Sequence, residues 1–308
     1  MIDFKELRKV VNGSLLENEP MSKHTSYGIG GPALAYITPQ DREDLSSILK
    51  FALENEIPVF FIGSGSNLLV SDKGIDGIVI TPAKSLKNLE IERNVIIAES
   101  GVMLGKLVKE SMKRNLTGLE SLIGVPGTLG GALVMNAGAF GGEISNYLIS
   151  VDIMTSKGEL KTYDASDIDF SYRFSSFTTD EFILLARFEL ETEKPEIISE
   201  KRKVASSGRK TNQPLRFRSA GSVFKNPKDH AAGYLIDKAG LKGKRIGDAE
   251  ISTHHANFFI NHGNASASDI TELIRLAKNA VLKEFDIELE LEIKTIGFEE
   301  KDKIELNG

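Results

Sequence analysis

The chain contains no cysteine. This absence excludes disulfide bonds, thiolate metal ligands, iron–sulfur clusters and cysteine nucleophiles together. Positive charge is in the minority, because 38 Lys and Arg stand against 44 Asp and Glu and give a net charge of −6 at pH 7. A chain with this charge balance is not expected to have nucleic acid as its main partner.

Long apolar segments are missing as well. No hydrophobic run approaches the roughly 18 residues that span a bilayer, and residues 1–6 lack the apolar core of a signal peptide. We therefore expect a cytoplasmic protein that does not enter a membrane. The 308 residues, 41% hydrophobic and 27% charged, suit two or three globular domains.

The hydrophobic pattern mixes short strands with helices and shows no regular strand–helix repeat. It therefore favours an α+β fold over a doubly wound parallel sheet. Thr38 is expected to cap a helix in which Pro39 is the first helical residue. Other helices are predicted at 3–16, 104–114, 195–209, 231–239 and 268–285, and strands at 58–62, 77–81, 95–99, 149–155, 158–163, 182–190, 258–261 and 287–296.

Glycine is concentrated in residues 118–142, which hold eight of the chain's 28 glycines. Such density costs backbone entropy, so it is expected where the chain bends sharply or lies against a ligand. Bare backbone amides can form a concave anion site. The apolar run 132–135 inside the stretch argues against a disordered linker. Two interpretations stay open, a buried set of turns and a cradle for a phosphate-bearing cofactor.

A second small-residue stretch, Gly63 to Leu68, follows the predicted strand at 58–62. Its amides and hydroxyls suit a pyrophosphate. It is not the dinucleotide fingerprint, because Leu68 stands where the third glycine belongs. Residues 28–33 do match G-x-G-x-x-A, but they follow the polar run 22–26 rather than an apolar strand, so this match is not a Rossmann signal.

Residues 219–227, S-A-G-S-V-F-K-N-P, could contribute chemistry. A hydroxyl at Ser222, followed by the Lys225 cation and the Asn226 amide, can donate a proton or bind an anion. The alternative is an ordinary polar turn ended by Pro227. Because G-x-S-x-G is absent, the segment is not a nucleophile elbow.

Arg173 lies between two aromatic residues, Tyr172 and Phe174. The planar fork of arginine binds carboxylate or phosphate through two hydrogen bonds, so Arg173 could be a clamp for such a group. The alternative is a surface arginine that lies over aromatic rings.

Three glutamates share one face of the predicted last strand: Glu288, Glu290 and Glu292. Such a row is usually a solvated face, and the pattern does not choose among the three. The doublet His254-His255 would point to opposite faces of a strand, so we expect no catalytic metal.

Six motifs occur in a fixed order. They are I-G-S-G-S-N-L-L at 62–69, G-V-P-G-T-L-G-G-A at 124–132, M-N-A-G-A-F-G-G-E at 135–143, Y-R-F-S at 172–175, A-G-S-V-F-K-N-P at 220–227 and L-E-L-E-I-K-T-I-G at 289–297. Together they resemble the bacterial UDP-N-acetylenolpyruvoylglucosamine reductases, the flavoenzymes that complete UDP-N-acetylmuramic acid. The similarity runs from about residue 24 to residue 297.

The resemblance implies a two-part FAD-binding region of the vanillyl-alcohol-oxidase (PCMH) type at 1–80 and 81–194, and a C-terminal α+β substrate-binding domain at 195–308. It implies non-covalent FAD, with NADPH as the hydride source. The residues carried over as FAD ligands are Gly63, Ser64, Gly65, Ser66, Asn67, Leu68, Pro126, Gly127, Thr128, Gly131, Asn136, Ala137 and Gly138.

The same resemblance assigns the catalytic roles to Arg173, Ser222 and Glu292, and so selects Glu292 from its row. Arg173 and Glu292 would polarise the intermediate that forms when hydride reaches the vinyl carbon of the substrate, and Ser222 would supply the quenching proton. The implied substrate contacts are Tyr172, Arg173, Lys225 and Asn226. No obligate protein partner is implied.

Two features depart from the family pattern. Leu289 to Glu292 reads L-E-L-E where the family often has L-E-P-E, and the insertion that carries a tyrosine in one subclass is missing after Arg187. The chain therefore resembles the shorter subclass, and Arg216, Arg218 and Lys225 are candidates to cover the UDP diphosphate. Two other functions stay open, another FAD-dependent oxidoreductase with the same cofactor fold and a nucleotide-sugar-binding protein without chemistry.

Overall fold

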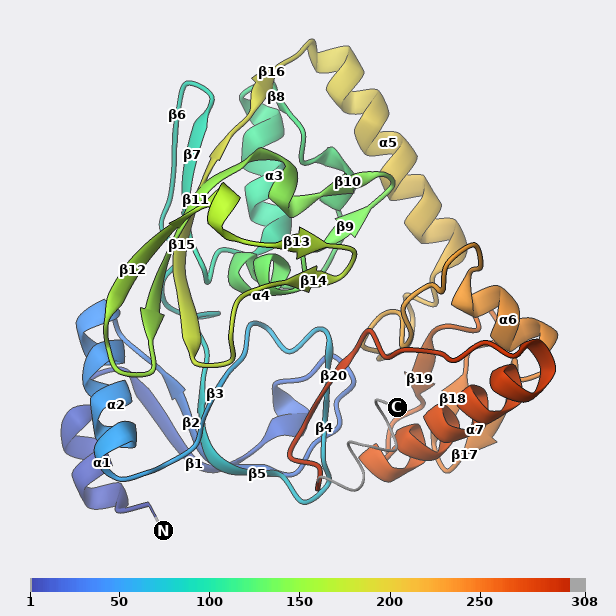
Figure 1. Cartoon of the computed structure of the whole chain (residues 1–308), viewed down its shortest axis with the longest axis horizontal. Coiled ribbons are helices and arrows are strands. Elements are labelled where there is room, and N and C mark those ends of the chain that lie inside the picture. The colour runs from blue at the N-terminus through green and yellow to red at the C-terminus, as the bar shows by residue number, and fades with distance from the viewer. Residues whose placement is uncertain (1, 300–308) are drawn as a thin grey trace. The chain divides into compact units, whose positions relative to one another are not determined.

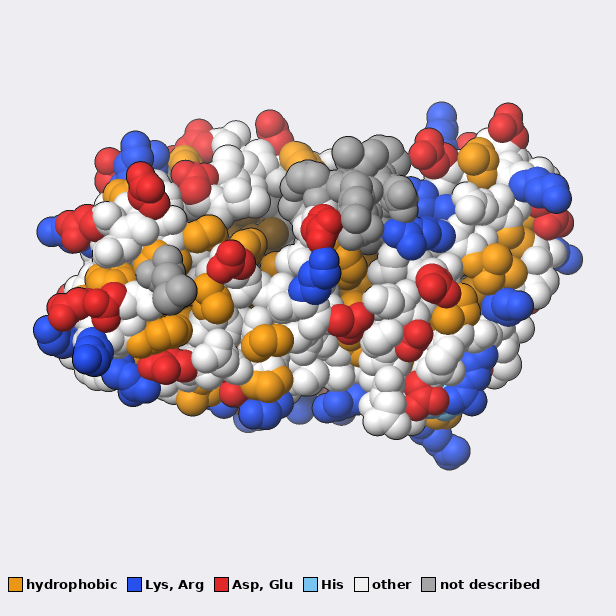
Figure 2. All heavy atoms as spheres, turned by 90° about the horizontal axis from the view of Figure 1, so that it is seen from below, with side chains coloured by type: hydrophobic (Ala, Val, Ile, Leu, Met, Phe, Trp, Pro, Cys, Tyr) orange, Lys and Arg blue, Asp and Glu red, His pale blue; other side chains and the backbone are white. Residues whose placement is uncertain are grey.

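The computed structural model describes residues 2–299, which form two compact units. Unit 1 collects residues 2–17, 34–64 and 77–209, and unit 2 collects residues 18–33, 65–76 and 210–299. Across this described range, none of the helices is both long and apolar enough to cross a membrane. Acidic and basic side chains are interspersed over the face shown in Figure 2.

The main sheet of unit 1 is antiparallel and has the order β12-β11-β15-β7-β6. Its strands are β6 (Leu89–Glu92), β7 (Val95–Glu99), β11 (Leu148–Thr155), β12 (Leu160–Asp164) and β15 (Glu181–Glu189). Helices α3 (Leu104–Lys113) and α4 (Leu129–Val134) lie beside it (Figure 1) and share one hydrophobic core with it. The predicted strand at 95–99 and the predicted hairpin at 149–163 are confirmed.

A second sheet has the order β1-β2-β5-β3, in which β3 and β5 run parallel. Its strands are β1 (Ser14–Pro20), β2 (Pro32–Thr38), β3 (Val59–Phe61) and β5 (Ile75–Ile80). Helices α1 (Phe4–Val10) and α2 (Arg42–Glu54) belong to unit 1 and share a hydrophobic core with residues of β2 and β5. Helix α2 buries one apolar stripe.

Two predicted boundaries in this region are wrong. The helix expected at 3–16 ends at Val10, because the following residues form β1. Thr38 does not cap α2, since it is the last residue of β2. Asp41 is the cap instead, and its carboxylate accepts from the Asp44 amide at 2.8 Å. Aspartate is a stronger N-cap than threonine, and strand pairing already occupies Thr38.

Several short elements complete unit 1. They are β8 (Leu116–Thr117), η2 (Glu120–Leu122), β9 (Gly138–Ala139), β10 (Gly142–Glu143), η3 (Ile144–Tyr147), η4 (Ala165–Asp167), β13 (Phe170–Ser171), β14 (Phe174–Ser175), β16 (Glu191–Thr192) and most of α5 (Pro195–Asn212). The hairpins β9–β10 and β13–β14 carry residues that the sequence predicts to be functional.

Unit 2 packs helices on a small antiparallel sheet. This sheet has the order β17-β18-β19. A separate pair of strands, β4 and β20, runs parallel. The elements are η1 (Met21–Lys23), β4 (Leu68–Val70), α6 (Ala232–Lys238), β17 (Arg245–Ile246), β18 (Ala249–Ile251), β19 (Phe259–Asn261), α7 (Ala267–Phe285) and β20 (Lys294–Ile296). Ser266 and Asp269 form a capping box that starts α7, and the buried face of α7 lies in the core of this unit.

The strand predicted at 287–296 is wrong over most of its length, because only Lys294–Ile296 is a strand. The predicted alternation of burial nevertheless holds: Leu289, Leu291 and Ile293 are buried. Residue 291 makes only an isolated bridge to Phe224, so the segment is extended without belonging to a regular sheet. Alternating side chains require an extended backbone and not a full ladder of strand hydrogen bonds.

Candidate cofactor and active site

The two glycine-rich stretches predicted to hold a cofactor meet in unit 1. A Cβ atom on Gly63 would lie 2.5 Å from Thr128 Oγ1 and 3.8 Å from the Gly131 Cα atom, so a larger residue does not fit at position 63. Thr81 Oγ1 donates to the Gly63 carbonyl at 2.9 Å. Thr128 is the N-cap of α4 and accepts from the Gly131 amide. Contact between the two loops is a condition for one shared cofactor site.

The rest of the first loop, Gly65 to Leu68, belongs to unit 2. Gly65 has a φ of +70°, and a Cβ atom there would lie 1.9 Å from the His24 carbonyl oxygen. Asn67 Nδ2 donates to the Glu292 carbonyl at 3.0 Å, and the Lys294 amide donates to the Asn67 carbonyl at 2.9 Å. The loop is thereby tied to the segment that carries the predicted catalytic glutamate.

Asn136 is buried within the second loop. Its Nδ2 donates to Glu143 Oε2 at 2.8 Å and to the Ser171 carbonyl at 3.0 Å. Its Oδ1 is also buried and has no hydrogen-bond partner within residues 2–299. A buried acceptor without a partner costs about 1–3 kcal/mol, and a bound molecule with a hydrogen-bond donor would remove that cost.

Arg173 stands in the turn of the β13–β14 hairpin with a φ of +57°. Ser175 Oγ donates to the Val134 carbonyl at 2.7 Å and so fastens this hairpin to the end of α4. A Cβ atom on Gly138 would lie 3.4 Å from Arg173 Nη1, so the guanidinium reaches the predicted cofactor loop. Arg173 also lies over the Tyr172 ring at 4.9 Å, as the surface interpretation expects.

Arg209, in α5, was not among the predicted site residues. Its guanidinium lies 5.7 Å from the Phe140 ring, and its Nε is buried without a partner in the described part of the chain. Burial lowers the pKa of Arg209, and the charge of Arg173 lowers it further. A bound anion would offset the repulsion between these two positive charges. No sequence pattern singles out Arg209, because it is one of several basic residues in a charged helix.

Ser222 and Glu292 come together in unit 2. Ser222 forms a bridge with Phe258, and the Glu292 amide donates to the carbonyl of Val223, the residue after Ser222, at 2.8 Å. Glu292 is half-buried, whereas Glu288 and Glu290 are exposed. Burial therefore selects the same glutamate that the family resemblance selects.

Asn257 was also missed, and it stiffens the Ser222 segment. Its Oδ1 accepts from the Phe224 amide at 2.9 Å, and its Nδ2 donates to the Phe224 carbonyl at 2.8 Å. The Asn257 carbonyl accepts from the Val223 amide at 2.8 Å. The buried side chain thus gives Phe224 both hydrogen bonds that a neighbouring strand would give. One asparagine among many carries no sequence signal for this role.

The predicted substrate contacts Lys225 and Asn226 follow Ser222 directly. Lys225 Nζ pairs with the Glu290 carboxylate, and Asn226 Oδ1 accepts from the Ala232 amide at 3.1 Å at the start of α6. The pairing with Glu290 partly neutralises Lys225. Lys225 is therefore less available to bind an anion than the sequence alone indicates.

Arg216 and Arg218, the other diphosphate candidates, are exposed residues. The Arg218 guanidinium covers Gly28, where a Cβ atom would lie 2.0 Å from Nη1. The Asn261 amide donates to the Arg218 carbonyl at 2.9 Å. The G-x-G-x-x-A match at 28–33 is therefore a glycine turn that makes room for an arginine.

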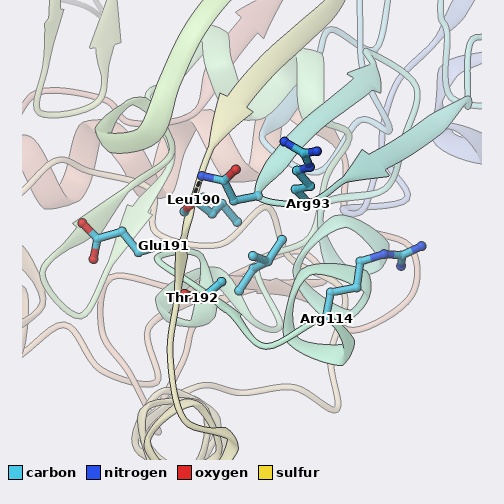
Figure 3. A pocket seen from close by; sticks show the side chains of 7 residues that line it. Arg93, Arg114, Leu190, Glu191 and Thr192 are labelled. Atoms are coloured by element: carbon cyan, nitrogen blue, oxygen red, sulfur yellow. Dashed lines mark hydrogen bonds between the residues drawn. The ribbon is translucent and has the colours of Figure 1, made fainter.

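A surface pocket lined by seven residues lies elsewhere in unit 1, between the β8–β16 pair and the turn that holds Arg93 (Figure 3). Arg93 and Arg114 line it, and their guanidinium groups point away from each other (Figure 3). None of the predicted site residues lines this pocket. It is not the candidate site.

Both histidines of the doublet His254-His255 form hydrogen bonds within unit 2. His254 Nε2 bonds with the Thr211 carbonyl at 2.7 Å, and His255 Nδ1 accepts from the Asn257 amide at 3.2 Å. Burial lowers the pKa of His255. Among the side chains that the structure describes, no group of three or more His, Cys, Asp or Glu could hold a metal ion.

Comparison with known proteins gives two family matches. An FAD-binding domain matches residues 33–164, and the C-terminal domain of UDP-N-acetylenolpyruvoylglucosamine reductase matches residues 213–296. The reductase of Alkaliphilus oremlandii is 42% identical over 299 residues, which are 96% of this chain and 98% of that protein. That of Clostridium tetani is 43% identical over 281 residues, or 91% of each chain.

A solved structure shows the same fold. The crystal structure of UDP-N-acetylenolpyruvylglucosamine reductase from Thermus caldophilus superposes with a TM-score of 0.78 at 35% identity. The match covers 92% of this chain and 99% of that one.

Proposed function

Because this chain belongs to the UDP-N-acetylenolpyruvoylglucosamine reductase family, we propose that it reduces UDP-N-acetylglucosamine enolpyruvate to UDP-N-acetylmuramate with NADPH. This reaction is a step in peptidoglycan precursor synthesis. The observation that supports it beyond the family is the backbone link between the Ser222 and Glu292 segments. Reduction of an enolpyruvyl ether needs a proton donor and a polarising group near the same carbon, and we assign these two roles to Ser222 and Glu292.

The residues of unit 1 fit FAD. Gly63 and Thr128 bring two amide-rich loops into contact, Asn136 offers a buried acceptor, and Arg209 supplies positive charge. Bare amides and guanidinium groups suit a diphosphate. When bound, FAD supplies the hydride that it has received from NADPH.

The side chains of this chain handle the charge and the proton. Arg173 binds the substrate carboxylate with its planar fork, and Glu292 polarises the carbon centre beside it. Ser222 delivers a proton to that carbon. Fixed groups of this kind are each worth about 3–4 kcal/mol of transition-state stabilisation. Tyr172, Lys225 and Asn226 contact the UDP-sugar, with Arg216 and Arg218 as further diphosphate contacts. The cytoplasmic location stays a prediction.

The function is tested with purified protein, NADPH and the enolpyruvyl sugar. We expect NADPH oxidation that depends on the sugar and yields UDP-N-acetylmuramate in equal amount, with oxygen a poor acceptor. Oxidation by oxygen without any reaction of the sugar would favour another flavin oxidoreductase. A colourless protein that still binds UDP-sugar would favour a binding protein without chemistry.

We further expect the FAD to be bound without a covalent link. The chain has no cysteine to tether a flavin. His24, whose carbonyl lies against Gly65 of the first loop, is engaged through Nε2 with Glu19 Oε1 at 3.0 Å. Acid precipitation should therefore leave the yellow colour in the supernatant. Colour retained in the washed pellet would contradict this prediction.

A further inference from the structure

The Asn136 amide joins two hairpins of unit 1. Through Nδ2 it reaches Glu143 at the end of β10, and it also reaches the carbonyl of Ser171 at the end of β13. Ser171 lies two residues before Arg173. Asn136 itself has a φ of +39°, a left-handed conformation that asparagine tolerates better than most residues.

The two partners fix which way the amide faces. A carboxylate and a carbonyl only accept hydrogen bonds, so the NH₂ group of Asn136 must point to both of them. Both protons of Nδ2 are thereby used, and Oδ1 must point away. This oxygen is buried and finds no donor anywhere in residues 2–299.

The absence of a side chain at Gly138 leaves room for the Glu143 side chain to reach the Asn136 amide. Gly138 and Glu143 are direct partners in the β9–β10 hairpin, and a Cβ atom on Gly138 would lie 2.9 Å from Glu143 Cγ. The turn between them, Phe140-Gly141, has φ values of 51° and 83°. Positive φ at both positions is the type I′ geometry that matches the twist of a two-residue hairpin.

We propose that Glu143 is a positioning residue for the cofactor: it locks the Asn136 amide so that Oδ1 accepts a hydrogen bond from a donor on the flavin. The donor is an N–H of the ring or a hydroxyl of the ribityl chain. This inference rests on the proposed function, since it assumes that FAD binds at this loop. It adds a residue outside the predicted set of FAD ligands.

The test measures the affinity of the apoprotein for FAD by flavin fluorescence. The variants are Glu143→Leu, Asn136→Ala, the double variant and Glu143→Gln, which keeps an acceptor oxygen. Glu143→Leu and Asn136→Ala are each expected to weaken FAD binding roughly 5- to 50-fold, the scale of one buried hydrogen bond. The double variant should be no worse than Asn136→Ala alone, and Glu143→Gln should bind FAD nearly as wild type does.

Glu181→Leu is the matched control. Glu181 is also a half-buried carboxylate of unit 1, and it accepts from the Tyr163 hydroxyl at 2.6 Å and the Thr178 amide at 2.9 Å. Its loss should lower stability and leave FAD affinity unchanged. FAD methylated at N3 identifies the donor. If wild type binds methylated FAD more weakly than FAD, while Glu143→Leu binds both equally, the donor is the ring N–H. If wild type binds both flavins equally, the donor is a ribityl hydroxyl.

Additive effects of Glu143→Leu and Asn136→Ala, or unchanged FAD affinity in either, would overturn the inference. If Glu143→Leu does not fold, the other variants still test the inference. Poor FAD binding by a folded Glu143→Gln, or an unchanged FAD affinity in Asn136→Ala, would refute it. Wild-type protein that binds no FAD at all would instead refute the proposed function.

Discussion

Replacing Ser222 with alanine is expected to slow reoxidation of the flavin by the enolpyruvyl sugar by roughly 100-fold or more, the lower range for a lost general acid. Reduction of the flavin by NADPH should continue at a near-normal rate, because that half-reaction needs no proton from Ser222. The serine is held by the bridge to Phe258 and by the stiff backbone after it. Stopped-flow absorbance measures each half-reaction separately.

Ser219→Ala is the control, since Ser219 lies in the same segment on the other side of Gly221. It should change neither half-reaction. Equal slowing of both halves in Ser222→Ala, or of neither, would mean that Ser222 is structural and that the proton comes from another group.

Replacing Arg173 with lysine is expected to reduce turnover of the enolpyruvyl substrate by about tenfold to a thousandfold, the scale of one electrostatic donor. Lysine keeps the positive charge but loses the planar fork that binds a carboxylate through two hydrogen bonds. The melting temperature should change little, because Arg173 occupies a hairpin turn and not a core position. Steady-state kinetics and thermal unfolding of the FAD-loaded protein provide the two measurements.

Arg187→Lys is the matched control for that variant. Arg187 forms a two-pronged ion pair with Asp152, with distances of 2.8 and 2.9 Å, on the main sheet of unit 1. This variant should lower stability and leave turnover near normal. If Arg173→Lys turns over the substrate at a near-normal rate, Arg173 is only a surface residue stacked on Tyr172.

The sequence by itself determined the class of the fold and the chemistry. Cysteine was absent and the strand–helix pattern irregular, so thiol chemistry and a doubly wound sheet were excluded. Glycine density predicted both candidate cofactor loops, because a cluster of glycines indicates a sharp bend or a close approach of the backbone. The order of the motifs identified the family. Local signals also predicted most helices and strands. They failed at Thr38, where strand pairing prevents helix capping, and at residues 287–293, where the backbone is extended but lacks a full ladder of strand hydrogen bonds.

Only the tertiary structure distinguishes the individual side chains that we propose for the site. Glu292 is distinguished from Glu290 by burial, and Asn257 by its two bonds to Phe224. Arg209 is distinguished by a buried Nε that has no hydrogen-bond partner among the residues that the structure describes. Glu143 matters because it fixes the Asn136 amide. Each of these properties depends on which groups distant in sequence approach a side chain. Burial and hydrogen-bond satisfaction are set by such packing, and residue type and spacing along the chain carry no record of it.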